Sequence, residues 1–249
     1  MLCYPGYMFR HKGKHRTFTQ NLKLASLLSF VAGIVNVSGF FAISTLTTNV
    51  TGHFAYFADE LVKNRWYQAQ VYLLYIIAFF LGAFFSSLCV EYVATRRPGY
   101  TYVIPLLLEM AILTTVSLLG ITVLQTNTQL IASILLFAMG MQNALVTSVS
   151  NSVVRTTHLT GLFTDLGIEI SQLFFYKEAA QKLKLKSSIQ LRLAIISFFF
   201  LGCLVGGYGY LMLGMPVLLL AVLCLSIGLS YDTARLKIVS IKRKYQKRD

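Results

Sequence analysis

The chain has 249 residues, of which 56% are hydrophobic and only 12% are charged, and its mean hydropathy is +0.65. A soluble domain of this size cannot bury so much apolar surface, so the composition excludes an ordinary soluble protein and predicts a membrane protein. The formal net charge of +13 would suit nucleic-acid binding, but the basic residues gather beside apolar stretches, and we expect no nucleic-acid partner.

Six apolar stretches follow one another along the chain, and each is long enough to cross about 30 Å of hydrocarbon as a helix of roughly 20 residues. None alternates between apolar and polar residues, so membrane β-strands are not expected. The turn between the last two stretches is predicted between Gly206 and Pro216. The six predicted spans are 22–46, 67–94, 102–124, 130–149, 190–211 and 213–231.

The basic residues predict an orientation. With both termini in the cytoplasm, 19 of the 22 lysines and arginines lie on the inner side and 2 on the outer side, while Arg192 lies at a membrane edge. This asymmetry predicts a multi-pass membrane protein with basic cytoplasmic tails at 1–21 and 232–249. The alternative role for these tails is binding of anionic lipids, worth about 1 kcal/mol per basic residue near the surface.

A short polar phrase occurs twice, as TTNVTGHF from Thr47 to Phe54 and as TTHLTGLF from Thr156 to Phe163. Other pieces recur in the same order and at similar offsets. The chain is therefore predicted to be a tandem duplication, with repeat 1 at 22–125 and repeat 2 at 129–231. The further matching pieces are Gly33-x-x-Asn36 with Gly140-x-x-Asn143, Phe79–Gly82 with Phe199–Gly202, and Pro105 with Pro216.

Each repeat contains three predicted spans, and an odd number of crossings leaves the chain on the opposite side of the membrane. The second copy must then enter upside down. We therefore predict an all-α polytopic membrane protein whose six transmembrane helices form two inverted three-helix repeats, with broken helices near the Thr-Gly motifs. Inverted repeats are typical of secondary transporters.

The repeated phrase reads as a helix break, because threonine and asparagine side chains compete for backbone hydrogen bonds and Gly52 and Gly161 allow a bend. Thr51 and Thr160 are expected to cap the helices that follow. A broken helix is tolerated in lipid only where it is buried in protein or lines a polar cavity. The alternative is that both phrases are surface turns. The predicted substrate-binding residues are Asn36, Thr48, Thr51, Gly52, Asn143, Thr157, Thr160 and Gly161.

Few ionisable residues lie in or beside the spans, and these are the candidates for coupling. Glu109 is either a proton or cation site facing the cavity, or a protonated or paired glutamate near the inner interface. Asp165 and Glu169 either stabilise a helix start or bind an ion. Arg155 could pair with Asp165, attract an anion, or anchor the chain at the inner face.

His53 and His158 lie in the two phrases at non-equivalent positions, and a histidine pair across a central cavity could couple transport to protons or bind a metal ion. Two ligands are too few for a typical closed metal site, so we predict no metal and no cofactor.

Several of these residues resemble a known family. The stretch VRTTHLTGLFTDLG from Val154 to Gly167, MQNAL from Met141 and NVTGH from Asn49 are similar to signature stretches of the YoaK family of uncharacterised bacterial integral membrane proteins. The chain has Asn36 where the family commonly has an acidic residue, and His53 where it commonly has asparagine. The resemblance implies a multi-pass fold in the bacterial inner membrane and brings no substrate or reaction.

The sequence contains no Gly-x-Ser-x-Gly, Walker or His-Glu-x-x-His motif, so we expect no enzyme. Three functions remain open: a small-solute secondary transporter or exporter, a passive channel, and a non-transporting scaffold that binds partners. Two helix N-termini would favour an anionic or carbonyl-bearing solute. The expected partners are the bilayer, a small-molecule solute and, as an option, a second copy of the chain.

Overall fold

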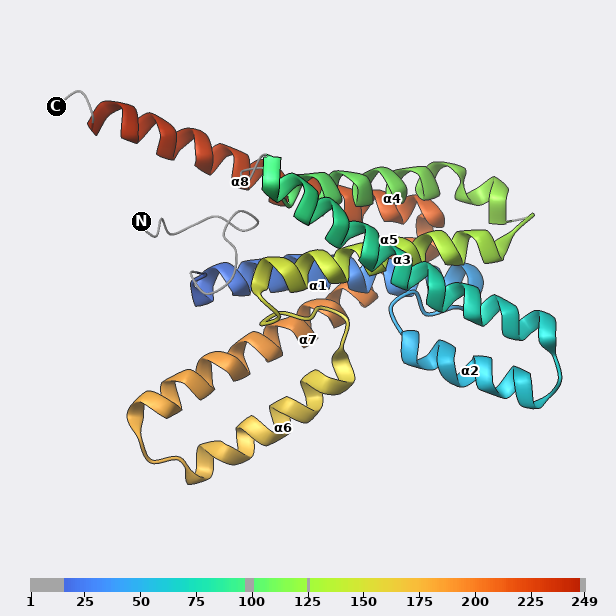
Figure 1. Cartoon of the computed structure of the whole chain (residues 1–249), viewed down its shortest axis with the longest axis horizontal. Helices are drawn as coiled ribbons and strands as arrows, with labels where there is room; N and C mark the ends of the chain where they lie inside the picture. Colours follow the sequence, from blue (N-terminus) through green and yellow to red (C-terminus); the bar gives the residue numbers. More distant parts are fainter. Residues whose placement is uncertain (1–15, 97–100, 125, 247–249) are drawn as a thin grey trace.

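The computed structural model describes residues 16–96, 101–124 and 126–246, and the regular structure in these ranges is helical (Figure 1). Residues 1–15 of the basic N-terminal tail, and the side chains from Arg235 onward, lie outside what is described, so lipid binding by the tails stays a prediction. The elements are α1 (Phe18–Ile43), α2 (Val50–Val62), α3 (Trp66–Arg96), α4 (Val103–Leu124), α5 (Thr128–Ser150), α6 (Leu159–Phe175), α7 (Ala179–Leu213), η3 (Met215–Val217) and α8 (Leu218–Gln246).

The six predicted spans coincide with α1, α3, α4, α5, α7 and α8. Five of these helices are long and apolar enough to cross a membrane, and the described part of α4, Val103–Leu119, is a shorter apolar helix. Large apolar side chains also stay exposed on the outer surfaces of α3 and α7, for example Phe84 at 57% and Met212 at 86%. Such surfaces are rare on soluble monomers and suit a lipid environment, so the chain is a multi-pass membrane protein.

Two helix boundaries differ from the prediction. Helix α7 begins at Ala179 instead of 190, and α8 continues to Gln246 instead of ending near 231. Both extensions are rich in lysine, which hydropathy assigns to loops although lysine is a good helix former. The turn between α7 and α8 falls near the C-terminal limit of the predicted range 206–216. There Gly214 adopts a φ of 70° and η3 begins.

The start of α1 has a local cause in the sequence. The Thr17 hydroxyl accepts a hydrogen bond from the Gln20 backbone N–H at 3.3 Å, and the Gln20 side chain accepts one from the Thr17 N–H at 2.9 Å. This reciprocal capping box satisfies two N–H groups that a helix start otherwise leaves unpaired.

Glycines allow two pairs of helices to approach closely. In α1 against α7, and again in α3 against α5, a Cβ atom added at the glycine would collide with a backbone carbonyl of the facing helix. Residues that correspond between the repeats make corresponding contacts, so the two interfaces are built alike. The glycines and the residues whose carbonyls they face are Gly33 with Phe199, Gly202 with Phe30, Gly140 with Phe79, and Gly82 with Phe137.

The apolar core draws on α1, α4, α5, α7 and α8, which surround fully buried side chains such as Leu28, Leu106 and Leu135. Along the long axis of the molecule, α1 begins and α8 ends at the same end, together with the turn between α6 and α7 (Figure 1). The turn between α2 and α3 lies at the opposite end. Helices α2 and α6 both begin in the middle part of the axis and run toward opposite ends (Figure 1).

Candidate functional site

The repeated phrase forms a break in the helical chain in both halves. Helix α1 ends at Ile43, and Ser44 turns the backbone into the left-handed region with a φ of 53°. Helix α5 ends at Ser150, and Asn151 and Ser152 do the same with φ values of 54° and 64°. After each break the chain turns back toward the middle of the molecule before α2 or α6 begins (Figure 1). The left-handed residues, and not the glycines of the phrase, make the turn.

The caps of α2 and α6 differ from the prediction. Asn49 caps α2, because its Oδ1 accepts a hydrogen bond of 3.1 Å from the Gly52 N–H. His158 occupies the corresponding position of α6 and makes no side-chain capping bond. Thr51 and Thr160 lie in the first turns and cap neither helix, so that expectation was wrong.

The two glycines of the phrase serve close packing. A Cβ atom at Gly52 would meet the Asn49 side chain, and one at Gly161 would collide with the His158 ring. Both glycines lie inside a helical turn, and neither has a positive φ. The predicted bend at these positions is therefore absent, and the glycines make room for the residue three positions earlier.

A threonine and an asparagine meet across each break. The Thr48 hydroxyl donates a hydrogen bond of 2.8 Å to Oδ1 of Asn36. In the other half, the Thr157 hydroxyl donates one of 2.8 Å to Oδ1 of Asn143. Each bond ties the segment before α2 or α6 to the middle of the preceding long helix. The two halves thus hold their breaks with the same bond between corresponding residues.

Both breaks line one cavity of about 780 Å³. Of the eight predicted binding residues, Asn143 contacts the cavity only through its partner Thr157, and Gly161 lines a neighbouring cavity. The phenylalanines Phe79 and Phe199 line the cavity from α3 and α7, and sequence reasoning had not assigned them to the site although their recurrence was visible. The predicted residues that line the cavity are Asn36, Thr48, Thr51, Gly52, Thr157 and Thr160.

A family model described as a protein of unknown function (DUF1275) matches residues 24–230 of the chain. The chain belongs to the DUF1275 family. The matched range contains both repeated phrases, the two Thr–Asn pairs and every residue that lines the shared cavity. Comparison with curated proteins and with solved structures found no match.

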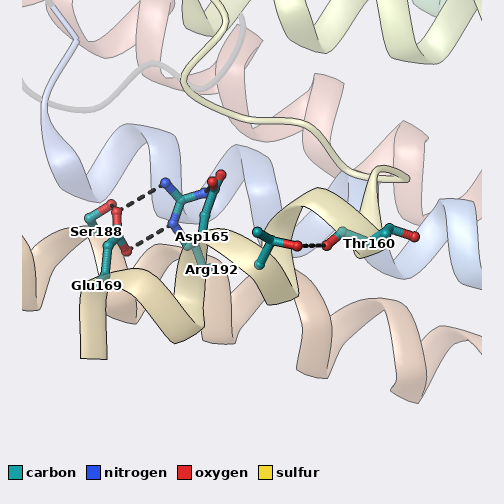
Figure 2. A network of polar contacts seen from close by, with 6 residues as sticks. Thr160, Asp165, Glu169, Ser188 and Arg192 are labelled. Carbon is teal, nitrogen blue, oxygen red and sulfur yellow. Dashed lines mark hydrogen bonds and ion pairs between the residues drawn. The ribbon is translucent and has the colours of Figure 1, made fainter. Parts of the chain in front are cut away.

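In this member of the DUF1275 family, a second cavity of about 500 Å³ lies between α6 and α7, and His158 lines both cavities. Arg192 of α7 crosses this region to α6. Its guanidinium donates to the Asp165 carboxylate at 2.8 Å and to the Glu169 carboxylate at 2.8 and 3.0 Å (Figure 2). The Ser188 hydroxyl donates to Glu169 at 2.6 Å. The network fastens α6 to α7.

The network excludes one of the roles predicted for Arg155, an ion pair with Asp165. Arg155 lines the second cavity but makes no ion pair with Asp165, whose partner is Arg192. The sequence analysis had assigned Arg192 only to a membrane edge and had predicted no partner for it. Burial opposes ionisation of Glu169, but hydrogen bonds from Arg192 and Ser188 outweigh it and lower the pKa of this carboxyl.

The two histidines do not face each other across the cavity. His53 is 3% exposed and packs among tyrosines, with its ring centroid 5.4 Å from that of Tyr75 and 6.2 Å from that of Tyr72. Its Nε2 lies 2.9 Å from the Leu46 carbonyl. Burial lowers the pKa of His53. The part of the chain that the structure describes holds no group of three or more metal-ligating side chains.

Glu109 lies apart from both cavities. It is fully buried on α4, and neither carboxyl oxygen has a hydrogen-bond partner among the described residues. One predicted alternative placed Glu109 in the wall of the shared cavity, and the structure contradicts that placement.

Proposed function

We propose that the protein is a small-solute secondary transporter or exporter in which two inverted repeats alternate access to the shared cavity. The observation that carries this proposal is that both helix breaks, 109 residues apart in sequence, line one cavity to which threonine and asparagine side chains contribute polar groups. The helices that follow the breaks, α2 and α6, both begin in the middle part of the molecule (Figure 1). Discontinuous helices that meet at a central site are the usual construction of substrate sites in such carriers. The resemblance to the YoaK family concerns the membrane fold alone and adds no evidence for transport.

The disposition of the helices supports an inverted arrangement. The turns of the α2–α3 and α6–α7 hairpins lie at opposite ends of the long axis (Figure 1). Among the inner segments assigned from the basic residues, the loop before α7 lies at the end at which α1 begins and α8 ends (Figure 1). Six crossings of the bacterial inner membrane with cytoplasmic termini are the topology we propose.

The packing suggests which parts move. The glycine contacts fasten α1 to α7 and α3 to α5 through backbone approach. Because α6 is tied to α7 and α2 packs on α3, two units result, which we call unit A (α1, α6, α7) and unit B (α2, α3, α5). Each unit supplies one asparagine of the Thr–Asn pairs. Rocking of unit A against unit B would open the cavity first to one side and then to the other.

The cavity lining defines a solute class in broad terms. Threonine hydroxyls and asparagine amides offer neutral hydrogen bonds, while Phe79 and Phe199 supply apolar walls. The start of α6 adds backbone N–H groups that no side chain caps. This combination suits a small polar solute with a carbonyl or anionic group. The proposal includes no enzymatic step and no cofactor.

Cysteine labelling tests alternating access without knowledge of the solute. All four native cysteines are replaced, and Ala55, which lines the cavity on α2, is changed to cysteine. A carrier exposes this cysteine to an impermeant maleimide in both right-side-out and inverted vesicles. A scaffold with a sealed interior leaves it unlabelled from at least one side, and that result contradicts the proposal. Conductance in planar bilayers would instead identify a channel.

A thermal-shift screen of solutes on the purified protein then addresses the substrate. A ligand at 100 times its Kd stabilises the folded state by about 2.7 kcal/mol. The Thr51→Val, Thr160→Val double variant provides the control, because both hydroxyls line the cavity and neither caps a helix. A genuine substrate shifts the Tm of the native protein and shifts that of the double variant less.

A further inference from the structure

Glu109 is the one acidic side chain on the described part of α4, and it stands on the buried face of that helix. Leu106 and Leu113 flank it at helical spacing on this face, and all three side chains are 0% exposed. Neither carboxyl oxygen has a hydrogen-bond partner among the described residues. An ionised carboxylate in such surroundings costs several kcal/mol unless it is paired, whereas a neutral carboxylic acid loses only its hydrogen bonds to water. The geometry therefore favours the neutral acid.

The fold does not need a carboxyl group at this position. By alignment of Pro105 with Pro216, the corresponding residue of the second repeat is Leu220. A leucine of similar size would fill the core without leaving polar atoms unsatisfied, and each such buried atom costs about 1–3 kcal/mol. Glu109 thus weakens the packing of α4, which points to a role other than stability.

Among the described residues, the elements packed against α4 supply no hydrogen-bond or ion-pair partner for Glu109. These elements are α3, α5, α8 and η3. Helix α5 and η3 contain no ionisable side chain. The ionisable side chains on the described part of α8 are the partly buried Cys224 and Tyr231 and the buried Asp232. On α3, Cys89 is partly buried, and the remaining ionisable residues near this end, Glu91, Tyr92 and Arg96, are exposed.

Ionisable groups come together at one end of α4. Tyr102 lies in the turn directly before α4, seven residues before Glu109, and its buried hydroxyl also has no hydrogen-bond partner among the described residues. Arg16 interacts electrostatically with Tyr102 and with Asp232 of α8. Tyr102 therefore stands between this charged end and Glu109. The same end contains the start of α1 and the end of α8 (Figure 1).

We propose that Glu109 is the proton-binding site of the carrier, filled in the conformation described here and emptied when the helices part and admit water to α4. This inference rests on the proposed transport function. Proton binding forms one O–H bond on the carboxyl, and release returns the proton to water at the Tyr102 end. The proton stabilises the conformation in which α4, α5 and α8 close over Glu109, and a ligand can shift an equilibrium only through such differential binding.

Glu109 can act on the cavity through α5. Helix α4 packs on α5, and α5 contains Asn143, the partner of the cavity residue Thr157. A movement of unit B that opens the cavity would also separate α5 from α4. The ionised form of Glu109 favours this separation because water can then solvate the carboxylate. Occupancy of the proton site and exposure of the cavity are linked by this one interface.

Infrared spectroscopy on the purified full chain tests proton occupancy directly. The native protein is expected to show a carboxylic acid C=O band at neutral pH, and Glu109→Gln should abolish it. Glu91→Gln, which changes an exposed acid on α3, should leave the band unchanged. A native protein without this band, or a band that persists in Glu109→Gln, overturns the proposal. Glu109→Leu, which installs the residue of the second repeat, serves if Glu109→Gln fails to fold.

Labelling of Ala55→Cys in vesicles then tests coupling. One linked proton changes the balance between the two conformations by up to about tenfold per pH unit, so the labelling rate should depend on pH in the native background. In Glu109→Gln, labelling should continue from both sides without this dependence. Glu91→Gln is the control, because it removes an exposed acid on α3 that lines neither cavity and should leave the dependence intact.

The outcomes separate the two proposals. Labelling of Glu109→Gln from both sides, with the same pH dependence as in the protein that has Glu109, would support alternating access. It would contradict the assignment of Glu109 as the proton site. Labelling from one side alone in the native background overturns alternating access, and the infrared band still decides whether Glu109 holds a proton.

Discussion

The Thr157 hydroxyl donates a hydrogen bond of 2.8 Å to Oδ1 of Asn143 across the break between α5 and α6. The corresponding bond in the first repeat has the same length. Replacement of Thr157 by valine keeps the shape of the side chain and leaves the Asn143 oxygen without its partner, a loss of about 1 kcal/mol. Thermal or denaturant unfolding of the purified variant measures this loss.

Two further variants show whether the pair is special. Thr48→Val is expected to cost the same as Thr157→Val, because the two bonds correspond. Thr115→Val removes a hydroxyl that bonds only to a carbonyl one turn earlier on the exposed face of α4, and it should be near neutral. A cost for Thr115→Val as large as for Thr157→Val would mean that the bond across the break contributes nothing particular.

The close contacts at glycine predict a sharp difference between glycine sites. An alanine at Gly33 or Gly140 would push the Cβ atom into a carbonyl of the facing helix, and overpacking of this kind typically costs about 1–3 kcal/mol. Gly167 of α6 has no heavy atom near its added Cβ, so Gly167→Ala should stabilise by roughly 0.5–1 kcal/mol through helix propensity.

The Tm values of the three alanine variants in one detergent provide the comparison. We expect Gly33→Ala and Gly140→Ala to lower the Tm by similar amounts, since the repeats build the α1–α7 and α3–α5 contacts alike. Equal tolerance at all three sites would contradict the fastening of unit A and unit B by backbone approach.

Much of the helical framework was predictable because the bilayer imposes a simple rule on length and hydropathy. All six apolar stretches became helices, and the turn at Gly214 fell inside the range that the glycines and Pro216 indicated. The rule fails beyond the apolar segments. The start of α7 and the end of α8 are rich in lysine. They are helical because lysine has a high helix propensity, which a hydropathy pattern does not detect.

The site was predicted in outline and missed in detail. The repeated phrase located both breaks, but Ser44 and Asn151 make the turns and Asn49 caps α2. None of these residues belongs to the Thr-Gly pairs that were predicted to bend the chain and cap the helices. Local sequence gives many residues that can cap or turn a helix, and tertiary packing selects among them. Arg192, the partner of Asp165, could not be predicted from local sequence because it lies 27 residues away and is brought to Asp165 by the packing of α7 on α6.

The Arg192 network predicts a specific dependence on charge and pH. Replacement of Arg192 by glutamine leaves Asp165 and Glu169 facing each other with no cation, so α6 should loosen from α7. Amide hydrogen exchange in α6 measures this change. Arg65→Gln is the matched control, because Arg65 is mostly exposed and lies 3.7 Å from Glu60 at the other hairpin, where an ion pair contributes little.

The sign of the pH effect follows from Glu169. Its pKa in the folded protein is lowered, so the pair with Arg192 stabilises the protein above the ordinary carboxyl pKa and loses this contribution as the pH falls through the lowered value. Acidification should therefore increase exchange in α6 of the native protein and have less effect in Arg192→Gln. Equal acid sensitivity of the two proteins would contradict this role of the network.

The cap of α6 offers a way to separate stability from function. His158 corresponds to Asn49 of the first repeat but makes no capping bond, although asparagine is among the best N-cap residues. His158→Asn should therefore stabilise the start of α6 by about 1 kcal/mol, because the new side chain can accept from the Gly161 N–H as Asn49 accepts from Gly52. The same change satisfies an N–H group that we propose faces the solute. We expect a higher Tm together with weaker stabilisation by any solute from the thermal screen, whereas Asn127→Ala, which removes the cap of α5 outside the cavity, should lower the Tm alone. A His158→Asn variant that gains stability and keeps full solute response would place recognition elsewhere in the cavity, on the threonines and phenylalanines.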